Sequence, residues 1–307
     1  MARDRLSLTA SHLSKSYFST VEIGSKYSST YKNYLILPNG GIGSYFHDIP
    51  INLNLPNKTC NVVIEIPRWS NAKFEINKDL QYNPITQDLK NNKPRFVKNL
   101  YPFKGYPQNY GAIPQTWDDP TIVETNTGYK GDNDPIDIVE IGSRIAQTGE
   151  VIECKILGSL ALIDDGELDW KVIAIDINDE LVNNSKNNLN DIQDVETVCP
   201  GLLSNIKLWF QNYKKPDGKS ENQFGFNGEY LNVDKTLEII QHGHQSWKNL
   251  INDQLKNQND KFPLIINTTQ VGTKGFVTQL NKNDIIQGNI HEKDSEIPKD
   301  IEKSYYF

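Results

Sequence analysis

The order of patterns along the chain predicts an α+β fold, mainly β, built on a β-barrel or sheet. Short alternating apolar runs, separated by Gly, Pro and Asn, occupy most of residues 24–178 and are typical of strands. Two later stretches repeat apolar residues every three or four positions, which is the period of a helix packed by one face. Many strands followed by two helices therefore predict a single domain, and a tail rich in Asn, Lys and Asp follows it.

The first strands contain a turn signal and unexpected charges. Residues 39–41, Asn-Gly-Gly, separate two apolar runs and predict a hairpin turn. The run CNVVIEIPRWSNAKFEI at 60–76 then carries charges at Glu65, Lys73 and Glu75. Lys73 and Glu75 lie two apart and share a strand face. On this pattern alone, we interpret them as an ion pair on a wet surface.

A strand pair and two helices follow. The run VIECKILGSLALIDDGELDWKVIAIDI at 151–177 predicts two strands joined by a turn rich in carboxylates. After Pro200-Gly201, one helical stripe consists of Leu203, Ile206, Phe210 and Tyr213. The second stripe consists of Ile240, His244, Trp247, Ile251 and Leu255. We expect a transit peptide or disordered leader at 1–23, one domain at 24–255, and an extension at 256–307 that packs on the domain or is partly irregular.

Composition disfavours several classes of protein. The net charge of −7 argues against general nucleic-acid binding, because a phosphate backbone requires a basic face. No apolar run approaches the length of a membrane-spanning helix. Cys60, Cys154 and Cys199 are odd in number and far apart, which indicates a reducing compartment without a disulfide framework.

The most informative stretch is KGDNDPIDIVEIG, at residues 130–142. Asp132 and Asp134 share a face of an extended chain, and Pro135 turns the chain so that Asp137 swings back toward them. Three converging carboxylates repel one another unless solvent or a cation neutralises them. Hard oxygen ligands suit Mg²⁺ or Mn²⁺. This run alone fits a solvated turn and a metal site about equally well.

Other charged groups favour the metal site. A second acidic cluster consists of Asp164, Glu167 and Asp169, and basic or phenolic side chains are interleaved with the two clusters. These are Lys73, Arg95, Lys171, Lys214, Tyr106 and Tyr213. A site with both carboxylates and cations suits phosphate chemistry, in which metals bridge phosphate oxygens and activate water. A glycosidase would not need so many positive groups. An EF-hand loop fails because Ile136 and Asp137 occupy its fifth and sixth positions, and a P-loop motif is absent.

The motifs resemble those of the family I soluble inorganic pyrophosphatases. The resemblance rests on GDNDPIDIVEIG, VVIEIPRWSNAKFEI, PRFVKNLYPFKGYPQNYGAIPQTW, ALIDDGELDWKVIAID and NYKKPDGKSENQFGF, which stand in the family's order from about Gly24 to Trp247. The separate terminal extensions resemble the eukaryotic branch, and FSTVEIGSKY resembles its mitochondrial members. The resemblance implies a five-stranded OB-like β-barrel with flanking helices, usually a homodimer. It also implies Mg²⁺-dependent hydrolysis of pyrophosphate by direct water attack, with no phosphoenzyme and with Mn²⁺ as a possible substitute.

The resemblance also implies roles for individual residues. Asp132, Asp137 and Asp169 would ligate the principal metals, and Asp134 would be the base. Asp164 would join Asp169 at a substrate-borne metal, Glu75 would help to position a further metal, and Glu65 would belong to the surrounding acidic shell. Arg95, Tyr213 and Lys214 would bind one phosphate, while Lys73 and Lys171 neutralise the remaining charge. Tyr106 would be the proton donor, with Tyr110 nearby, and Arg68 and Trp69 resemble a dimer contact.

Two other functions stay open at this point. One is an inactive OB-type binding or scaffold protein, because this barrel also binds oligonucleotides. The other is a two-metal phosphomonoesterase. For location, Arg3, Arg5 and Lys15 against Asp4 in a Ser/Thr-rich leader favour mitochondria, with the cytoplasm as the alternative.

Overall fold

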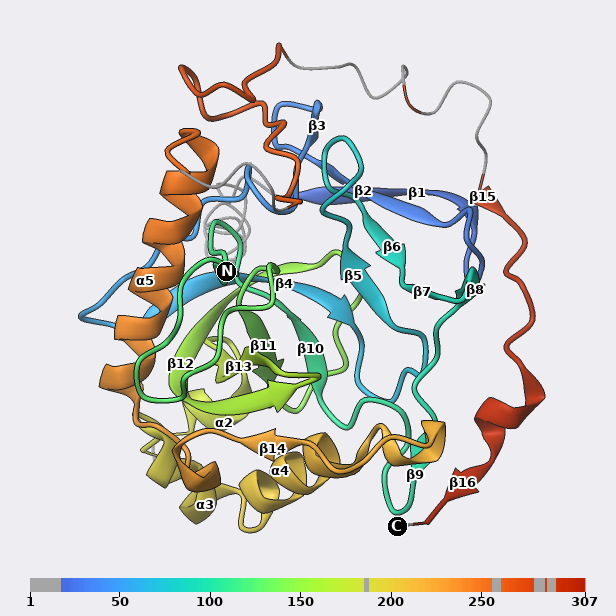
Figure 1. Cartoon of the computed structure of the whole chain (residues 1–307), viewed down its shortest axis with the longest axis vertical. Coiled ribbons are helices and arrows are strands. Elements are labelled where there is room, and N and C mark those ends of the chain that lie inside the picture. Colours follow the sequence, from blue (N-terminus) through green and yellow to red (C-terminus); the bar gives the residue numbers. More distant parts are fainter. Residues whose placement is uncertain (1–17, 185–187, 256–260, 279–284, 286–290, 307) are drawn as a thin grey trace, which may run out of the picture.

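The computed structural model describes residues 18–184, 188–255, 261–278, 285 and 291–306. Most of the expected leader, residues 1–17, lies outside the described residues. The end of the expected leader 1–23 is described and forms a strand: β1 spans Ser19–Ser25, and its residues 19–23 pair with β2, Lys32–Ile36. The architecture is mainly β with a few helices, as the sequence predicted (Figure 1).

One six-stranded sheet forms the centre of the molecule. Its order is β13-β11-β10-β4-β12-β14, and β13 also pairs with β12. The strands β4, β10, β11 and β13 thus each have two paired neighbours within this sheet, and β12 has three, namely β4, β13 and β14. The strands are β4 Thr59–Ile66, β10 Asn109–Ala112, β11 Asp137–Glu140, β12 Val151–Asp164, β13 Glu167–Asp176 and β14 Gln223–Phe224.

The longest hairpin in this sheet follows directly from its turn residues. Strands β12 and β13 are antiparallel, and Asp164 pairs with Glu167 across a two-residue turn. Asp165 and Gly166 both have positive φ, 49° and 92°. Asp-Gly is a preferred sequence for such a turn, because both central residues must adopt the left-handed region. The predicted acidic turn is confirmed, and it holds Asp164 at the end of one strand.

A second sheet packs beside the first, with the order β15-β1-β2-β6-β5 and β3 paired with β2. Its further strands are β3 Ile42–Gly43, β5 Phe74–Ile76, β6 Ile85–Gln87 and β15 His291–Glu292. The predicted Asn-Gly-Gly hairpin is confirmed, since Ile36 pairs with Ile42 across it. Two small pairs complete the strands: β7 Leu89–Lys90 with β8 Lys93–Pro94, and β9 Asn99–Leu100 with β16 Ser304–Tyr305.

The helices cover the outside of the central sheet (Figure 1). Both predicted helices are confirmed, as α4 Leu202–Asn212 and α5 Val233–Ile251. The others are α2 Glu180–Asn183 and α3 Ile192–Val198, with 3₁₀ turns at Lys215–Asp217, Phe226–Gly228 and Lys299–Glu302. Asn232 caps α5 by accepting a hydrogen bond from the Lys235 N–H at 3.0 Å. Helix α5 buries Ile240 and Trp247, two members of the predicted stripe.

The described parts of the C-terminal extension are mostly irregular but well anchored. The carboxylate of Asp48 accepts hydrogen bonds from the backbone N–H groups and hydroxyls of Thr268 and Thr269. The final stretch runs down one side of the molecule to β16, which pairs in parallel with β9 (Figure 1). Ile301 is buried there. The tail thus holds to the domain through hydrogen bonds and a few apolar side chains, which leave little periodicity in the sequence.

Candidate active site

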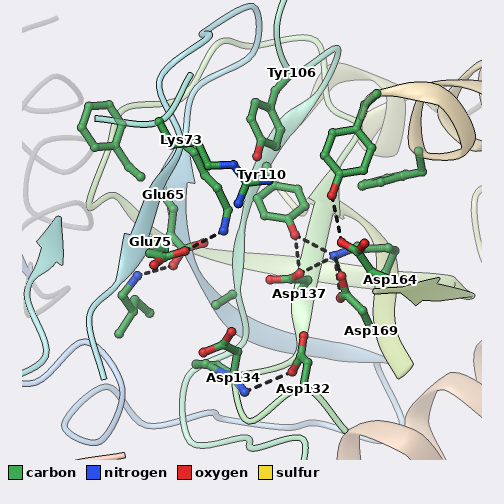
Figure 2. Close-up of a pocket in the computed structure, with 18 of the residues that line it drawn as sticks. Glu65, Lys73, Glu75, Tyr106, Tyr110, Asp132, Asp134, Asp137, Asp164 and Asp169 are labelled. Atoms are coloured by element: carbon green, nitrogen blue, oxygen red, sulfur yellow. Dashed lines mark hydrogen bonds and ion pairs between the residues drawn. The ribbon is translucent and has the colours of Figure 1, made fainter. Parts of the chain in front are cut away.

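A cavity of about 250 Å³ opens beside the central sheet. All fourteen side chains for which the sequence predicted a metal, catalytic or substrate role line this cavity: Glu65, Lys73, Glu75, Arg95, Tyr106, Tyr110, Asp132, Asp134, Asp137, Asp164, Asp169, Lys171, Tyr213 and Lys214. Figure 2 shows ten of them converging from opposite walls. The structure therefore brings the whole predicted set together, whereas Arg68 and Trp69 lie elsewhere.

The pleat of the strands explains how distant residues reach one cavity. Residues two apart on a strand share a face, and this spacing relates Asp169 to Lys171 on β13. Asp137 on β11 is the direct parallel partner of Lys171. Asp164 ends β12, and Tyr213 and Lys214 stand where α4 ends. Secondary structure thus fixes most of this wall of the site.

Lys171 links the two carboxylates on that wall. Its Nζ lies 2.5 Å from oxygens of both Asp137 and Asp169 and donates to the Tyr110 hydroxyl at 2.8 Å. The Tyr110 hydroxyl in turn donates to Asp137 (Figure 2). Only 3% of the Lys171 side chain is exposed. Burial alone would lower the pKa of Lys171, but the two aspartates outweigh it and raise that pKa above the ordinary value.

The next group on this wall surrounds Asp164. The Tyr213 hydroxyl donates to one Asp164 oxygen at 2.9 Å, and the Lys214 ammonium contacts the other. Lys214 also contacts Asp165 at 2.9 Å. The Tyr213 hydroxyl and the Lys214 ammonium therefore donate to carboxylates that line the cavity.

The opposite wall carries Lys73, Glu75 and Glu65 (Figure 2). Lys73 pairs with Glu75 at 2.7 Å and lies 3.4 Å from Asp88, which also accepts from Arg95 at 2.9 Å. The expected Lys73–Glu75 ion pair is therefore present and its side chains are 26% and 39% exposed, but it lines the cavity rather than an open surface. Glu65 is buried within β4 and accepts from the Ile76 N–H at 2.6 Å.

The floor of the site is the acidic loop between β10 and β11, which supplies Asp132 and Asp134 (Figure 2). The Asp134 N–H donates to the Asp132 carboxylate at 3.0 Å. Lys78 follows the C-terminal end of β5, and its Nζ lies 2.6 Å from Oδ1 of Asp134. The loop thus turns both carboxylates toward the cavity while its backbone remains hydrogen-bonded.

Desolvation and mutual repulsion raise several carboxyl pKa values. Desolvation raises the pKa of Asp132 well above its ordinary value, and the charges of Asp134 and Asp118 raise it further. Desolvation and the charges of Asp137 and Asp132 raise the pKa of Asp169, although Lys171 opposes the shift. Burial also raises the pKa of Glu65 and of Asp118. These groups would be stabilised in their ionised forms by added positive charge.

The donor set fits divalent metal ions. Among the described residues that line the cavity, nine carboxylates face only four cationic side chains. As the side chains stand, no group of three or more Asp, Glu, His or Cys in the described part of the chain is placed to hold one ion. Lysine ammonium groups instead lie between the carboxylates. Since carboxylate oxygens are the ligands that hard divalent cations prefer, small side-chain movements would give such ions a site.

The tyrosines form a phenolic roof over the cavity (Figure 2). The Tyr106 and Tyr110 rings lie 5.2 Å apart, and Trp209 packs 5.0 Å from Tyr106. Burial raises the pKa of Tyr106 to about 12, although Lys73, Arg95 and Lys171 pull it down. The Tyr106 hydroxyl is thus protonated at neutral pH.

Sequence reasoning missed several residues of this site. Lys78 and Asp88 make ion pairs with predicted members, Asp118 raises the pKa of Asp132, and Asp169 raises the pKa of Asp118. Asp165 lines the cavity without an expected role, and so does Glu167, which the sequence placed only in the second acidic cluster. Asp165 and Glu167 lie in the acidic turn, which the sequence did predict. Lys78, Asp88 and Asp118 carry no spacing signal, because only the tertiary fold brings them to the cavity.

A cavity with many carboxylates, a few fixed cations and buried tyrosines is typical of enzymes that hydrolyse phosphates with divalent metals. Comparison with known proteins identifies the family. The family model for inorganic pyrophosphatase matches residues 62–248. The chain therefore belongs to the inorganic pyrophosphatase family.

Individual relatives agree with the family match. The mitochondrial inorganic pyrophosphatase of Saccharomyces cerevisiae is 47% identical over 94% of this chain and 89% of its own length. The Drosophila melanogaster inorganic pyrophosphatase is 51% identical over 76% of this chain and 68% of its own. The solved inorganic pyrophosphatase of Schistosoma japonicum has a TM-score of 0.86 at 41% identity, covering 94% of this chain and all of that one. A truncated Trypanosoma cruzi vacuolar soluble pyrophosphatase, solved in complex with PPi, has a TM-score of 0.70 at 40% identity over 76% and 91%.

Proposed function

We propose that the chain hydrolyses inorganic pyrophosphate to two phosphates in an Mg²⁺-dependent reaction, by direct attack of water and without a phosphoenzyme. The observation that carries this proposal is the cavity lining, which combines nine carboxylates with Lys73, Arg95, Lys171 and Lys214. A polyanion such as pyrophosphate enters an acidic cavity only with divalent cations that reverse the local charge. The described lining contains no Ser, Thr, Cys or His that could accept a phosphoryl group. An aspartate could also accept a phosphoryl group, but in this proposal the aspartates bind metal ions or transfer a proton, and water is the nucleophile.

The carboxylates divide between metal binding and proton transfer in this proposal. Asp132, Asp137 and Asp169 would hold the principal Mg²⁺ ions, with Mn²⁺ as a substitute. Asp164 would join Asp169 at the metal that arrives with the substrate. Glu75 would help to position a further ion, and Glu65 would belong to the acidic shell around them. Bound Mg²⁺ would supply neutralisation of phosphate oxygens and a lowered pKa of the attacking water.

Asp134 is the proposed general base. Its carboxylate projects into the cavity from the floor, opposite the cationic and phenolic groups (Figure 2). It would accept the proton of the attacking water as the bridging P–O bond breaks. The Lys78 ammonium holds this carboxylate by an ion pair at 2.6 Å.

The cations and phenols would bind the two phosphoryl groups. Arg95, Tyr213 and Lys214 would hold one phosphate, and substrate oxygens would replace Asp164 and Asp165 as acceptors for the last two. Lys73 and Lys171 would neutralise charge on the other phosphoryl group, beside Tyr110. Tyr106, whose hydroxyl is protonated at neutral pH, would be the proton donor to the leaving phosphate.

The Asp134→Asn variant tests this assignment, because the amide cannot take a proton but has nearly the same size. We expect turnover to fall by at least about a hundredfold, while Mn²⁺ binding to the metal-free protein, measured by electron paramagnetic resonance (EPR), stays near that of the wild type. Asp253→Asn, a change at an exposed residue that pairs with Lys274, is the matched control and should keep full turnover. A loss smaller than about tenfold in Asp134→Asn would show that another group is the base.

We further propose that the ring of five paired strands is an OB-like barrel, and that residues 24–255 form one catalytic domain with 256–307 as an extension packed on it. The pairing of β12 with both β4 and β13 supports the barrel. The anchors at Asp48 and the burial of Ile301 support the packing of the extension.

We also propose that the chain forms a homodimer through the surface around Trp69. Trp69 is 53% exposed and has φ of 66°, an uncommon conformation for a bulky residue. Arg68, the other expected contact, already donates to Gln108 at 2.9 Å within its own chain. Trp69→Ser should therefore shift the protein to monomers in sedimentation analysis, and an unchanged mass would contradict the proposed surface.

For location, we propose the mitochondrion, with the cytoplasm as the alternative. One relative over 94% of the chain is a mitochondrial protein, and the expected leader carries basic residues. None of the helices in the described residues is long and apolar enough to cross a membrane. A fusion of residues 1–25 to a fluorescent reporter should enter mitochondria, and a cytoplasmic reporter would overturn this.

A further inference from the structure

Asn133 lies between Asp132 and Asp134 but has no role in the proposed chemistry. Its φ of 68° places it in the left-handed region, which Asn tolerates better than most residues. Its N–H donates to the Asp118 carbonyl at 2.9 Å, and its carbonyl accepts from the Lys78 ammonium at 3.2 Å. The turn at Asn133 therefore sets the directions in which the two flanking aspartates leave the backbone.

The Asn133 side chain is hydrogen-bonded at both ends. Its Oδ1 accepts from the Trp117 indole N–H at 3.1 Å, and its Nδ2 donates to the Lys261 carbonyl at 3.0 Å. An indole nitrogen can only donate and a carbonyl can only accept, so the amide has a single orientation that satisfies both partners. The acidic loop is thus tied to the core on one side and to the C-terminal extension on the other.

The segment Lys261–Leu264, which we call the C-terminal clamp, reinforces both sides of this tie. The Phe262 ring packs edge-on against fully buried Trp117, with centroids 5.5 Å apart. The Leu264 N–H donates to the carbonyl of Lys78, whose side chain contacts Asp134. The Lys261 ammonium also pairs with Asp79 at 2.8 Å. The clamp therefore contacts both Asn133, inside the acidic loop, and Lys78, which pairs with Asp134 of that loop.

The clamp lies outside residues 62–248, the part of the chain that the family model matches. Asn133 and Lys78, which the clamp contacts, lie within that part. An element of the extension therefore contacts the supports of the catalytic loop without contributing a group to the cavity.

We propose that Asn133 is a positioning residue, and that the C-terminal clamp acts through it to preset the geometry of Asp132 and Asp134 for metal ions and water. This inference rests on the proposed function. Carboxylates that bind metals or accept a proton must be held within a fraction of an ångström of their working positions. Without the tie, the loop samples more conformations, and part of the metal-binding free energy is spent on ordering it.

The test uses Asn133→Gly, Phe262→Ala and the double variant of the full chain. Glycine can adopt the left-handed backbone and removes the side-chain amide, while Phe262→Ala removes the packing on Trp117. Phe276→Ala is the matched control, because it truncates the same residue type elsewhere in the extension. The readouts are Mn²⁺ binding to the metal-free protein by EPR, kcat and KM for pyrophosphate with Mg²⁺, and thermal unfolding.

We expect each single variant to weaken Mn²⁺ binding by roughly fivefold, the effect of losing one or two hydrogen bonds or their support. We expect kcat to fall more than KM rises, because the substrate-binding cations are untouched. The double variant should bind Mn²⁺ no more than about twofold more weakly than Asn133→Gly, since both changes break the same connection. Phe276→Ala should match the wild type.

Three results would overturn the inference: Mn²⁺ binding and kcat within twofold of the wild type in both single variants, an equal loss in Phe276→Ala, or fully additive losses in the double variant. If Phe262→Ala does not fold, Phe262→Leu keeps most of the apolar contact and should change Mn²⁺ binding in the same direction by a smaller factor. Weakened Mn²⁺ binding in a chain whose wild type releases no phosphate from pyrophosphate would support the clamp and refute the proposed function.

Discussion

The buried histidine beneath the C-terminal clamp gives the sharpest prediction of stability. His47 is fully buried, and its Nδ1 accepts a hydrogen bond from the Trp247 indole N–H at 2.9 Å. Its Nε2 lies 2.9 Å from the Leu264 carbonyl, which only a ring N–H can satisfy. The imidazole is therefore the neutral Nε2–H tautomer. Protonation would require Nδ1 to become a donor and would break the bond from Trp247.

Burial lowers the pKa of His47 from its ordinary 6.5 to about 4, although the Leu264 carbonyl and Asp48 oppose the shift. Between these two values, the unfolded chain binds a proton that the folded chain excludes. The contribution of neutral His47 to stability is thus fully present above pH 6.5 and is lost as the pH falls toward 4. From linkage, this residue alone removes about 2 kcal/mol of unfolding free energy between pH 7 and pH 5.

The assay is urea unfolding of the metal-free wild type and of His47→Gln at pH 7 and pH 5, at one protein concentration with a chelator present. Glutamine can donate to the Leu264 carbonyl but does not titrate. His47→Gln should be less stable at pH 7, because the Trp247 N–H loses its partner, yet it should lose about 2 kcal/mol less than the wild type on acidification. Equal losses in the two proteins would refute a neutral, buried His47.

Three further changes have predictable results. Lys171→Met leaves the buried Asp169 and the partly buried Asp137 without their cation, so the metal-free protein should lose about 3 kcal/mol in urea unfolding, and Mg²⁺ should restore part of it; equal stability with and without Mg²⁺ would contradict this. Gly111→Ala places a Cβ 1.9 Å from the Val63 carbonyl oxygen and should yield little folded protein, whereas Gly40→Ala meets no atom within 4 Å and should cost about 1 kcal/mol, as circular dichroism will show. Asp48→Ala removes the acceptor that anchors the C-terminal extension, so limited proteolysis should cut that extension at least about tenfold faster, and an unchanged rate would mean that the anchor is dispensable.

Local pattern was sufficient for much of the fold and of the site. Strand β12 ends at Asp164 because the following Asp-Gly specifies a two-residue hairpin turn, and strand alternation related Asp169 to Lys171. Their convergence with Asp132 and Asp137 follows from strand pairing, which spacing alone does not specify. The resemblance to a family supplied that step, and every residue for which it implied a metal, catalytic or substrate role lines the cavity.

The supports of the site were not predictable in the same way. Asp88 and Asp118 reach the cavity region through tertiary packing, and neither stands in a repeating pattern. The clamp is harder still to find, because the Asn133–Lys261 bond joins residues 128 positions apart and uses a backbone carbonyl. Every residue type has a backbone carbonyl, so the identity of residue 261 gives almost no sign of this bond.

The most direct test is phosphate release by the purified full chain from pyrophosphate, ATP and p-nitrophenyl phosphate, each with Mg²⁺ and with excess chelator. We expect rapid release from pyrophosphate, little from the two organic phosphates, and none from any substrate in chelator. A phosphomonoesterase would favour p-nitrophenyl phosphate, and a binding or scaffold protein would release phosphate from none of them. Absence of release from pyrophosphate with Mg²⁺, or equal release in chelator, would contradict metal-dependent hydrolysis of pyrophosphate in this cavity.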